Sequence, residues 1–500
     1  MDRNDVLFLA PLLVISLIVR LLAAFLFIEE PTIPHDMGYY VEYAKFFDEG
    51  KPYDKIQSNK LPVVYGPATL VFYWGWSKIA GSDFLSLKIM PIVFDLAAIV
   101  VIYFIAKNII GRLKAEYASF FYASFYLVLI SSGALGNDDH IFMFFLLCGI
   151  FMAIEHRIAL SGVLVGLASG FKPVPIAMAP LIMYYVYRKR GISDAVKFGI
   201  ISALTFLIIL VPFYLESGER ALVPYTLTVN FEYFGAGGIA PINLGRIVAG
   251  GMENVLFYLE NGEFIPFEKN PLKTTNKTPV NDFFVFLSKP LFYLSFLAFV
   301  IYAYLFKMKN PEIELFRNIV FLIFFSLLSS KVLTDLLFLY AIPALTILIA
   351  SLKKDLEEFE YRRSEIAYFG IIMMAIIIFS LFYRERAPQN LIEGSLFAMF
   401  VVLAVVGTYS VFRKTGFASG ISIFVLGCSL FAVNDASPLY VLKPLISILV
   451  PDASFGVETI HSYLIKTLNT LLSGFFVFSG AVLILLKAHN QLNSYQQMPS

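Results

Sequence analysis

Residues 7–28 read LFLAPLLVISLIVRLLAAFLFI, an apolar stretch that contains a single charged side chain, Arg20. About 20 such residues carry an α-helix across the hydrocarbon core of a bilayer. The stretch is too long for the apolar region of a signal peptide, and it shows no small-residue cleavage site. It therefore predicts a retained first membrane helix with an unusual intramembrane arginine.

The composition of the whole chain also indicates a membrane protein. Of the 500 residues, 58% are hydrophobic and 15% are charged, whereas soluble proteins carry about 25% charged residues. The net charge of +1 gives no reason to expect nucleic acid as a partner. The two cysteines, Cys148 and Cys428, both lie in apolar runs, which excludes a disulfide framework and a cysteine-based zinc site.

Apolar runs recur along the chain and predict an all-α polytopic bundle of about 13–14 transmembrane helices. The expected spans lie near residues 7–28, 89–106, 117–134, 141–154, 159–171, 174–187, 197–214, 290–306, 316–330, 336–351, 366–382, 392–412, 417–433 and 463–486.

The basic residues of short loops predict the orientation of these spans. With the N-terminus inside, strict alternation places Lys107, Arg112 and similar loop residues on the cytoplasmic face, as the positive-inside rule favours. The same alternation gathers the polar segments of interest on the external face. These segments are the loop 29–88, GNDDH at 136–140, Lys172–Pro173, the loop 215–289 and SSKVLTD at 329–335.

The loop 29–88 contains two predicted helices of its own. Tyr40, Tyr43 and Phe47 recur at helical spacing, and Gly50 is placed to stop a helix lying in the membrane interface. Residues 66–81, GPATLVFYWGWSKIAG, hold both tryptophans of the chain and predict a juxtamembrane helix.

Asp36 stands directly before the first of these helices, and two interpretations are compatible. Aspartate is a preferred N-cap residue. A carboxylate held beside a substrate hydroxyl is also a general base.

A further polar segment, GNDDH at 136–140, carries candidate functional residues. Asp138 and Asp139 would be costly near hydrocarbon, which favours a functional role; a solvated turn with Asp139 capping the next helix is the alternative. Asp-Asp-His is a weak metal signal without defined ligand spacing, so we expect no metal or cofactor.

Two lysines lie near membrane-spanning segments on the predicted external face. Lys172, between two apolar runs, either binds an anion or extends its amine to water. Lys331 either binds an anion or pairs with Asp335 one turn later. Arg20, His140, Arg246 and His461 are weaker candidates.

The order of these features resembles a known family. Arg20 in the first helix, Asp36 and Tyr40 outside it, EGKPYDK at 49–55 and VVYGP at 63–67 are similar to the opening of glycosyltransferases with the GT-C fold. The resemblance is to polyprenyl-phosphate-mannose-dependent mannosyltransferases: the GPI mannosyltransferase I family and its bacterial relatives. It extends over about residues 15–345.

The resemblance implies a GT-C-like catalytic module over residues 1–350, followed by additional helices at 351–487 and a polar tail at 488–500. It also implies an inverting transfer of a sugar, mannose in this family, from polyprenyl phosphate to a lipid-linked or glycolipid hydroxyl on the external or lumenal face. Asp36 would be the general base. The candidate substrate-binding residues are Asp139, His140, Lys172, Lys331, Tyr40 and Tyr65, of which the two lysines are candidates from their charge and position.

One feature departs from the family pattern. Eukaryotic members have Asp-x-Asp where this chain has Asp36-Met37-Gly38, so a metal-binding role of that motif is not expected. The implied membrane is the plasma membrane in a prokaryote and the endoplasmic reticulum in a eukaryote. A transporter or flippase of lipid-linked sugars, and a non-catalytic assembly subunit, remain alternatives.

Overall fold

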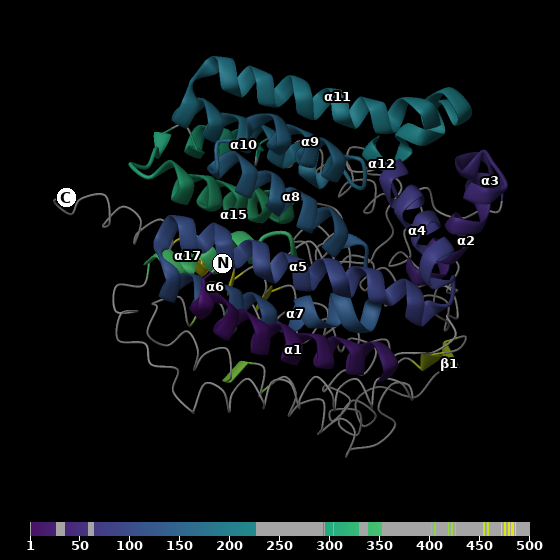
Figure 1. Cartoon of the computed structure of the whole chain (residues 1–500), viewed down its shortest axis with the longest axis horizontal. Coiled ribbons are helices and arrows are strands. Elements are labelled where there is room, and N and C mark those ends of the chain that lie inside the picture. Colours follow the sequence, from purple (N-terminus) through teal and green to yellow (C-terminus); the bar gives the residue numbers. More distant parts are fainter. Residues whose placement is uncertain are drawn as a thin grey trace, which may run out of the picture. The chain divides into compact units, whose positions relative to one another are not determined.

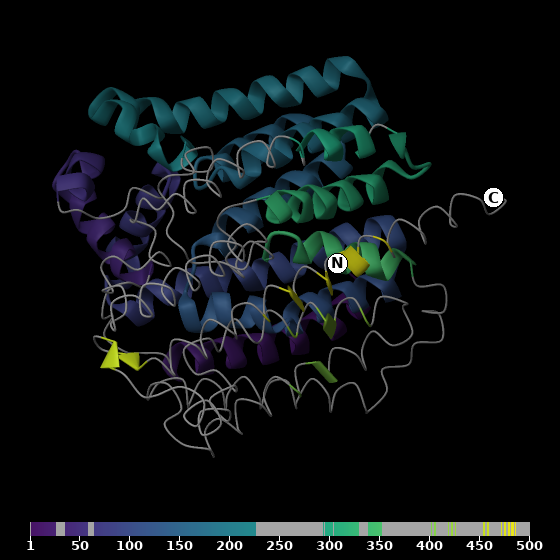
Figure 2. The ribbon, with the colours of Figure 1, turned by 180° about the vertical axis from the view of Figure 1, so that it is seen from behind.

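The computed structural model of the chain describes residues 2–26, 36–58, 65–226, 294–329 apart from 295 and 304, 339–352, and short pieces between 402 and 486. Its regular structure is helical apart from one antiparallel pair, β1 (Ser454–Phe455) and β2 (Glu458–Thr459) (Figures 1 and 2). The predicted all-α class is confirmed. The chain divides into two compact units, and the candidate site lies in the first, which comprises residues 1–230, 308–319 and 342–359.

The longest helices of the described chain are apolar enough to cross a membrane. They are α1 (Arg3–Leu26), α5 (Phe84–Ile110) and α11 (Ile192–Ser217). Shorter apolar helices accompany them: α8 (Asp139–Ile154), α9 (Ile158–Ser169) and α17 (Ile342–Leu352). The chain is thus an integral membrane protein, as its composition predicted.

Within the first unit these helices pack as a row. Helix α11 contacts α9, α9 contacts α8, α8 contacts α5 and α5 contacts α1 (Figure 1). The unit also contains α10 (Val174–Arg190), η2 (Gly218–Leu222), α12 (Val223–Thr226) and the start of α15 (Pro311–Ser329).

The chain between α1 and α5 contains three short helices, α2 (Asp36–Asp48), α3 (Pro52–Ser58) and α4 (Pro67–Ala80). Helix α2 ends just before Gly50, whose φ of +72° lies in the left-handed region that glycine tolerates. The indole Nε1 of Trp74 in α4 donates to Asp48 Oδ1 at 2.7 Å, which ties the end of α2 to α4. Both helices predicted in this loop, and the stop at Gly50, are confirmed.

The predicted span 117–134 is wrong as a single helix. Helix α6 (Arg112–Ser124) ends at Phe125, and α7 (Tyr126–Leu129) follows and widens into a π-helix, η1 (Ile130–Leu135). The distortion lies where Gly133 meets α1, because a Cβ atom there would lie 2.9 Å from the Arg20 carbonyl oxygen. Hydropathy reports the length of an apolar run and carries no information about such a contact.

A buried polar network joins the helices that surround Arg20. Arg20 Nε lies 2.5 Å from Asp95 Oδ2, and both side chains are fully buried. The same carboxylate accepts from Tyr122 Oη at 2.9 Å, and His140 Nδ1 lies 3.3 Å from Asp95 Oδ1. One carboxylate on α5 therefore links α1, α6 and α8 in the interior of the unit.

We predict that Arg20→Met lowers the free energy of unfolding by about 3–5 kcal/mol, because it leaves the Asp95 charge buried without its main partner. The measurement is thermal unfolding of the full chain in detergent. The double variant Arg20→Met/Asp95→Leu should recover most of the loss, and Arg3→Met, at an exposed position, should have little effect. A double variant no more stable than Arg20→Met would contradict the prediction.

Candidate active site

Lys172 lies in the break between two helices. Helix α9 ends at Ser169, and Phe171 turns back through a hydrogen bond from its N–H to the Ala168 oxygen. Pro173 and Pro175 then open α10, where proline is tolerated because the first helical N–H groups have no partner within the helix. The break keeps the Lys172 side chain at the end of the bundle, 17% exposed.

Two consecutive carboxylates meet this lysine. Lys172 Nζ lies 2.8 Å from Asp138 Oδ1 and 2.5 Å from Asp139 Oδ1. Asp138 also accepts from Tyr40 Oη at 3.0 Å and from Thr69 Oγ1 at 3.1 Å. Four segments of the chain thus converge, which carry Tyr40, Thr69, the Asp138–Asp139 pair and Lys172.

Aromatic rings enclose the same lysine. Its Nζ lies 5.3 Å from the ring centroid of Tyr65 and 5.8 Å from that of Phe142, within the range of a cation–π interaction. Tyr40 stacks on Tyr73, with ring centroids 4.1 Å apart, and meets Tyr65 edge-on at 5.0 Å. We call Tyr40, Tyr65, Thr69, Asp138, Asp139 and Lys172 the Lys172 cluster.

The electrostatics of the cluster are suited to a charged polar substrate. Asp138 is fully buried, and two hydroxyl groups and the ammonium of Lys172 bind its oxygens, so its charge is well compensated. The Lys172 ammonium lies against both carboxylates, and these three side chains together carry a formal charge of −1. Carboxylates beside it can accept a hydrogen bond or a proton from a sugar hydroxyl.

The loop before α4 is held against the α9–α10 break by backbone contacts. Gly66 N donates to the Phe171 oxygen at 2.9 Å, and Ala68 N donates to the Gly170 oxygen at 3.0 Å. Tyr65 precedes this contact, so its ring is fixed relative to Lys172. Within VVYGP at 63–67, Gly66 therefore allows the backbone to approach that of Gly170 and Phe171, and Pro67 begins α4.

A second tyrosine supports Tyr65 from α3. Tyr53 is fully buried and its Oη donates to the Tyr65 carbonyl oxygen at 3.0 Å. Burial raises the pKa of Tyr53 well above its ordinary value, so this hydroxyl remains a donor at all physiological pH values.

Two predicted residues have placements that the sequence did not indicate. The side chain of His140 lies against Asp95, away from Lys172, because consecutive helix residues point about 100° apart. Asp139 is not a helix cap: α8 begins at Asp139, and Asp138 at the N-cap position makes no capping hydrogen bond. The Asp138 carboxylate instead binds the hydroxyl groups of Tyr40 and Thr69 and the ammonium of Lys172.

Asp36 is the first residue of α2 and not the residue before it. It lies four residues before Tyr40, the spacing that puts two positions on one helix face. The placement of its side chain is outside the described residues, as are Lys331, Asp335, Arg246 and His461. Their proposed roles stay predictions.

Two residues of these networks were missed from the sequence. Asp95 sits in the middle of the apolar run MPIVFDLAAIVV, and an intramembrane carboxylate is a signal that could have identified it. Thr69 offers no such signal, because a threonine in an apolar helix is common.

Metal ligation finds no support in the described part of the chain. No group of three or more histidine, cysteine, aspartate or glutamate side chains there lies close enough to hold a metal ion. Because the Asp36 side chain falls outside that part, metal independence stays a prediction.

Comparisons with known proteins bear on this site. Residues 64–215, less than a third of the chain, match the family model of dolichyl-phosphate-mannose-protein mannosyltransferases. This segment contains Tyr65, Thr69, Asp138, Asp139 and Lys172. The match confirms the resemblance to glycosyltransferases that use polyprenyl-phosphate-linked sugars, and it supports such a membrane enzyme.

Comparisons with solved structures and with curated proteins add no further evidence about this chain. The crystal structure of ArnT from Cupriavidus metallidurans bound to undecaprenyl phosphate aligns with 98% of this chain and 78% of its own, at 12% identity and a TM-score of 0.46. A likeness of that size supports no inference about this chain. No curated protein matches this chain.

We predict that Gly66→Ala destabilises the protein by about 1–3 kcal/mol, as overpacking does. The added Cβ would lie 2.3 Å from the Gly170 oxygen and 2.7 Å from the Phe171 oxygen, both of them backbone atoms. Gly75→Ala in α4 is the matched control, because a Cβ there has no atom within 4 Å and alanine favours a helix. Thermal unfolding measures both. The explanation fails if Gly66→Ala unfolds at the wild-type temperature.

Proposed function

We propose that this chain is an inverting glycosyltransferase that moves a sugar from a polyprenyl-phosphate carrier to a hydroxyl of a lipid-linked or glycolipid acceptor. The observation that carries the proposal is the convergence of Tyr40, Asp138, Asp139 and Lys172 at one end of a membrane bundle. Mannose is the proposed sugar, in keeping with the resemblance and with the description of the matching family.

The position of the cluster suits a donor held in the lipid. Helix α10 begins beside Lys172 and ends at Arg190, and Arg188 near that end pairs with Glu314 at 3.0 Å. The cluster and these basic residues are therefore at opposite ends of α10. By the positive-inside rule, the end with Arg188 and Lys189 faces the cytoplasm, so the proposed reaction takes place on the external or lumenal face.

In the proposed step one bond to the sugar C1 forms, another breaks, and one proton is transferred. The acceptor hydroxyl attacks the sugar C1 from the side opposite the carrier while a carboxylate takes its proton. The bond between C1 and the phosphate oxygen breaks, and its electron pair stays on polyprenyl phosphate. Asp36 is the proposed base, one helical turn before Tyr40.

Lys172 is the proposed partner of the leaving phosphate. Negative charge grows on the phosphate oxygen as the bond breaks, and a fixed cation stabilises it most in a site of low polarity. Asp138 binds the ammonium, and Asp139, which binds it as well, is the proposed partner of a sugar hydroxyl. The proposed mechanism calls for no metal or organic cofactor, and Lys331 is a second proposed cation.

The division of the chain into modules and the membrane that holds it are also part of the proposal. Residues 1–350 would form the catalytic module, and the helices of 351–487 would contribute to acceptor binding or to a partner subunit. The membrane would be the plasma membrane in a prokaryote or the endoplasmic reticulum in a eukaryote.

We predict that Lys172→Gln lowers kcat for sugar transfer by about 10²–10³-fold, the usual cost of removing one such charge-stabilising group. The assay supplies purified protein with polyprenyl-phosphate sugars and candidate lipid acceptors. Lys189→Gln is the matched control, because Lys189 is also ion-paired, to Glu312 at 2.6 Å, at the far end of α10. Equal rates for wild type and Lys172→Gln would exclude this role of Lys172.

We predict that Asp36→Asn lowers the rate of sugar transfer to the background level, because an amide cannot take the proton of the acceptor hydroxyl. Asp48→Asn, at the other end of α2 and paired with Lys78 at 2.6 Å, should retain activity. A role of Asp36 limited to the helix start predicts only about 1 kcal/mol of lost stability and near-normal turnover, and that result would refute it as the base.

A further inference from the structure

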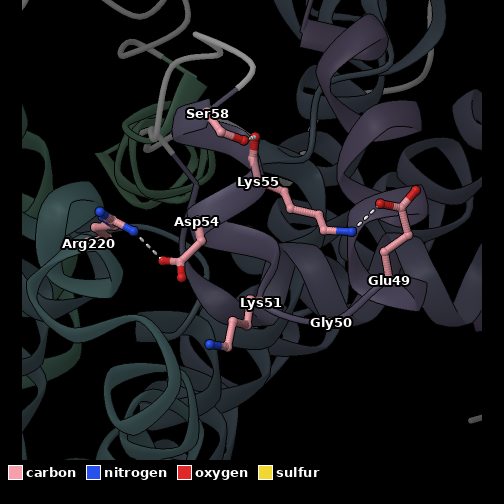
Figure 3. Close-up of a pocket in the computed structure, with 7 residues that line it drawn as sticks. All are labelled: Glu49, Gly50, Lys51, Asp54, Lys55, Ser58 and Arg220. Atoms are coloured by element: carbon pink, nitrogen blue, oxygen red, sulfur yellow. Dashed lines mark hydrogen bonds and ion pairs between the residues drawn. The ribbon is translucent and has the colours of Figure 1, made fainter.

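A second polar site lies outside the Lys172 cluster. An open pocket of about 650 Å³ separates the start of α3 from η2 (Figure 3). Its lining residues are Glu49, Gly50, Lys51, Asp54, Lys55, Ser58 and Arg220, and we call it the α3 pocket. Three of these side chains are cations and two are carboxylates, so the pocket has a net positive charge.

The cations of the α3 pocket differ in their partners. Lys55 pairs with Glu49, and Arg220 Nη1 lies 2.5 Å from Asp54 Oδ1. Lys51 forms no ion pair with any residue in the described ranges of the chain, and Figure 3 draws its ammonium without a partner. One cation is therefore available for an anion from outside the protein.

The backbone holds Lys51 in an unusual conformation. Gly50 has φ +72° and Lys51 has φ +52°, a left-handed pair in which lysine is uncommon. The Lys51 N–H donates to Glu216 Oε1 on α11 at 2.8 Å, which fixes this turn. Unfavourable backbone conformations that the fold maintains are concentrated at binding sites.

The ion pairs of the other two cations are exposed to solvent, and the Lys55 and Glu49 side chains are 34% and 55% exposed. The Arg220 and Asp54 side chains are 48% and 32% exposed, and exposed ion pairs contribute little to stability. A phosphate group accepts several charge-assisted hydrogen bonds at once, including a bidentate pair from arginine. It can therefore bind Lys51 and draw Arg220 and Lys55 away from their carboxylates.

A tryptophan bound next to the pocket indicates where such a phosphate would come from. Glu49 in its wall follows Asp48, which is bound by Trp74 Nε1, and tryptophan side chains prefer the level of the lipid headgroups. We propose that the α3 pocket binds the phosphate of an anionic headgroup, at a site separate from the Lys172 cluster. Free phosphate offers the same chemistry, and the experiment below separates the two sources.

The α3 pocket has a direct connection to the Lys172 cluster. Tyr53 lies next to Asp54 in α3 and donates to the Tyr65 carbonyl oxygen at 3.0 Å. A bound headgroup would therefore stabilise the element that supports Tyr65. The binding itself does not depend on the transfer reaction.

The test measures lipid binding by the full purified chain in detergent, with bound lipids counted by native mass spectrometry. Wild type should bind phosphatidylglycerol about tenfold more tightly than zwitterionic phosphatidylcholine. Lys51→Gln should weaken phosphatidylglycerol binding about tenfold, and Lys51→Arg should preserve it. Lys78→Gln is the control, because Lys78 is an exposed cation of the same external loop outside the pocket. Unchanged binding by Lys51→Gln, or an equal loss in Lys78→Gln, would overturn the proposal.

Two further arms define the ligand. Displacement of phosphatidylglycerol by millimolar inorganic phosphate supports a soluble phosphate as the natural ligand, and retention supports the lipid. Displacement by an equal concentration of polyprenyl phosphate would show that the pocket is part of the donor site, and it would overturn the proposal that the α3 pocket and the Lys172 cluster are separate sites. Asp139→Asn should still bind phosphatidylglycerol, so a failure of the proposed transfer reaction is distinguishable from a failure of this site.

Discussion

The ion pairs of Lys172 with Asp138 and Asp139 hold together the end of the bundle that carries the site. A charge near hydrocarbon is costly unless an opposite charge or several hydrogen bonds compensate it. Lys172 compensates part of the charge of Asp138 and Asp139, and the hydroxyl groups of Tyr40 and Thr69 make further contacts to Asp138. The requirement to satisfy buried charge thus brings α2, α4, the start of α8 and the α9–α10 break together.

The same requirement acts deeper in the unit through Asp95. Its carboxylate binds Arg20 and Tyr122 and lies beside His140, so three other helices contact one residue of α5. His140 and Asp139 are neighbours on α8, yet each belongs to a different network. The buried network therefore fixes the rotation of α8 and, with it, the direction in which Asp139 meets Lys172.

Close backbone contacts set the remaining geometry. Gly66 approaches the carbonyl groups of Gly170 and Phe171, and Gly133 approaches that of Arg20. Neither site leaves room for a Cβ atom. These contacts place the start of α4 against the α9–α10 break and the π-helix against α1, which side-chain packing alone would not require.

The amino-acid sequence by itself determined the membrane class, the positions of most of the described helices, and the two larger helices of the loop after α1. These follow from local properties: apolar length, helix breakers and the charges of short loops. The tertiary structure alone decided that Asp138 receives Tyr40, Thr69 and Lys172, that His140 turns to Asp95, and that residues 117–134 are interrupted. It also created the α3 pocket from residues 49–58 and Arg220. Such outcomes depend on how helices distant in sequence rotate and approach one another, and no local pattern in the chain encodes that.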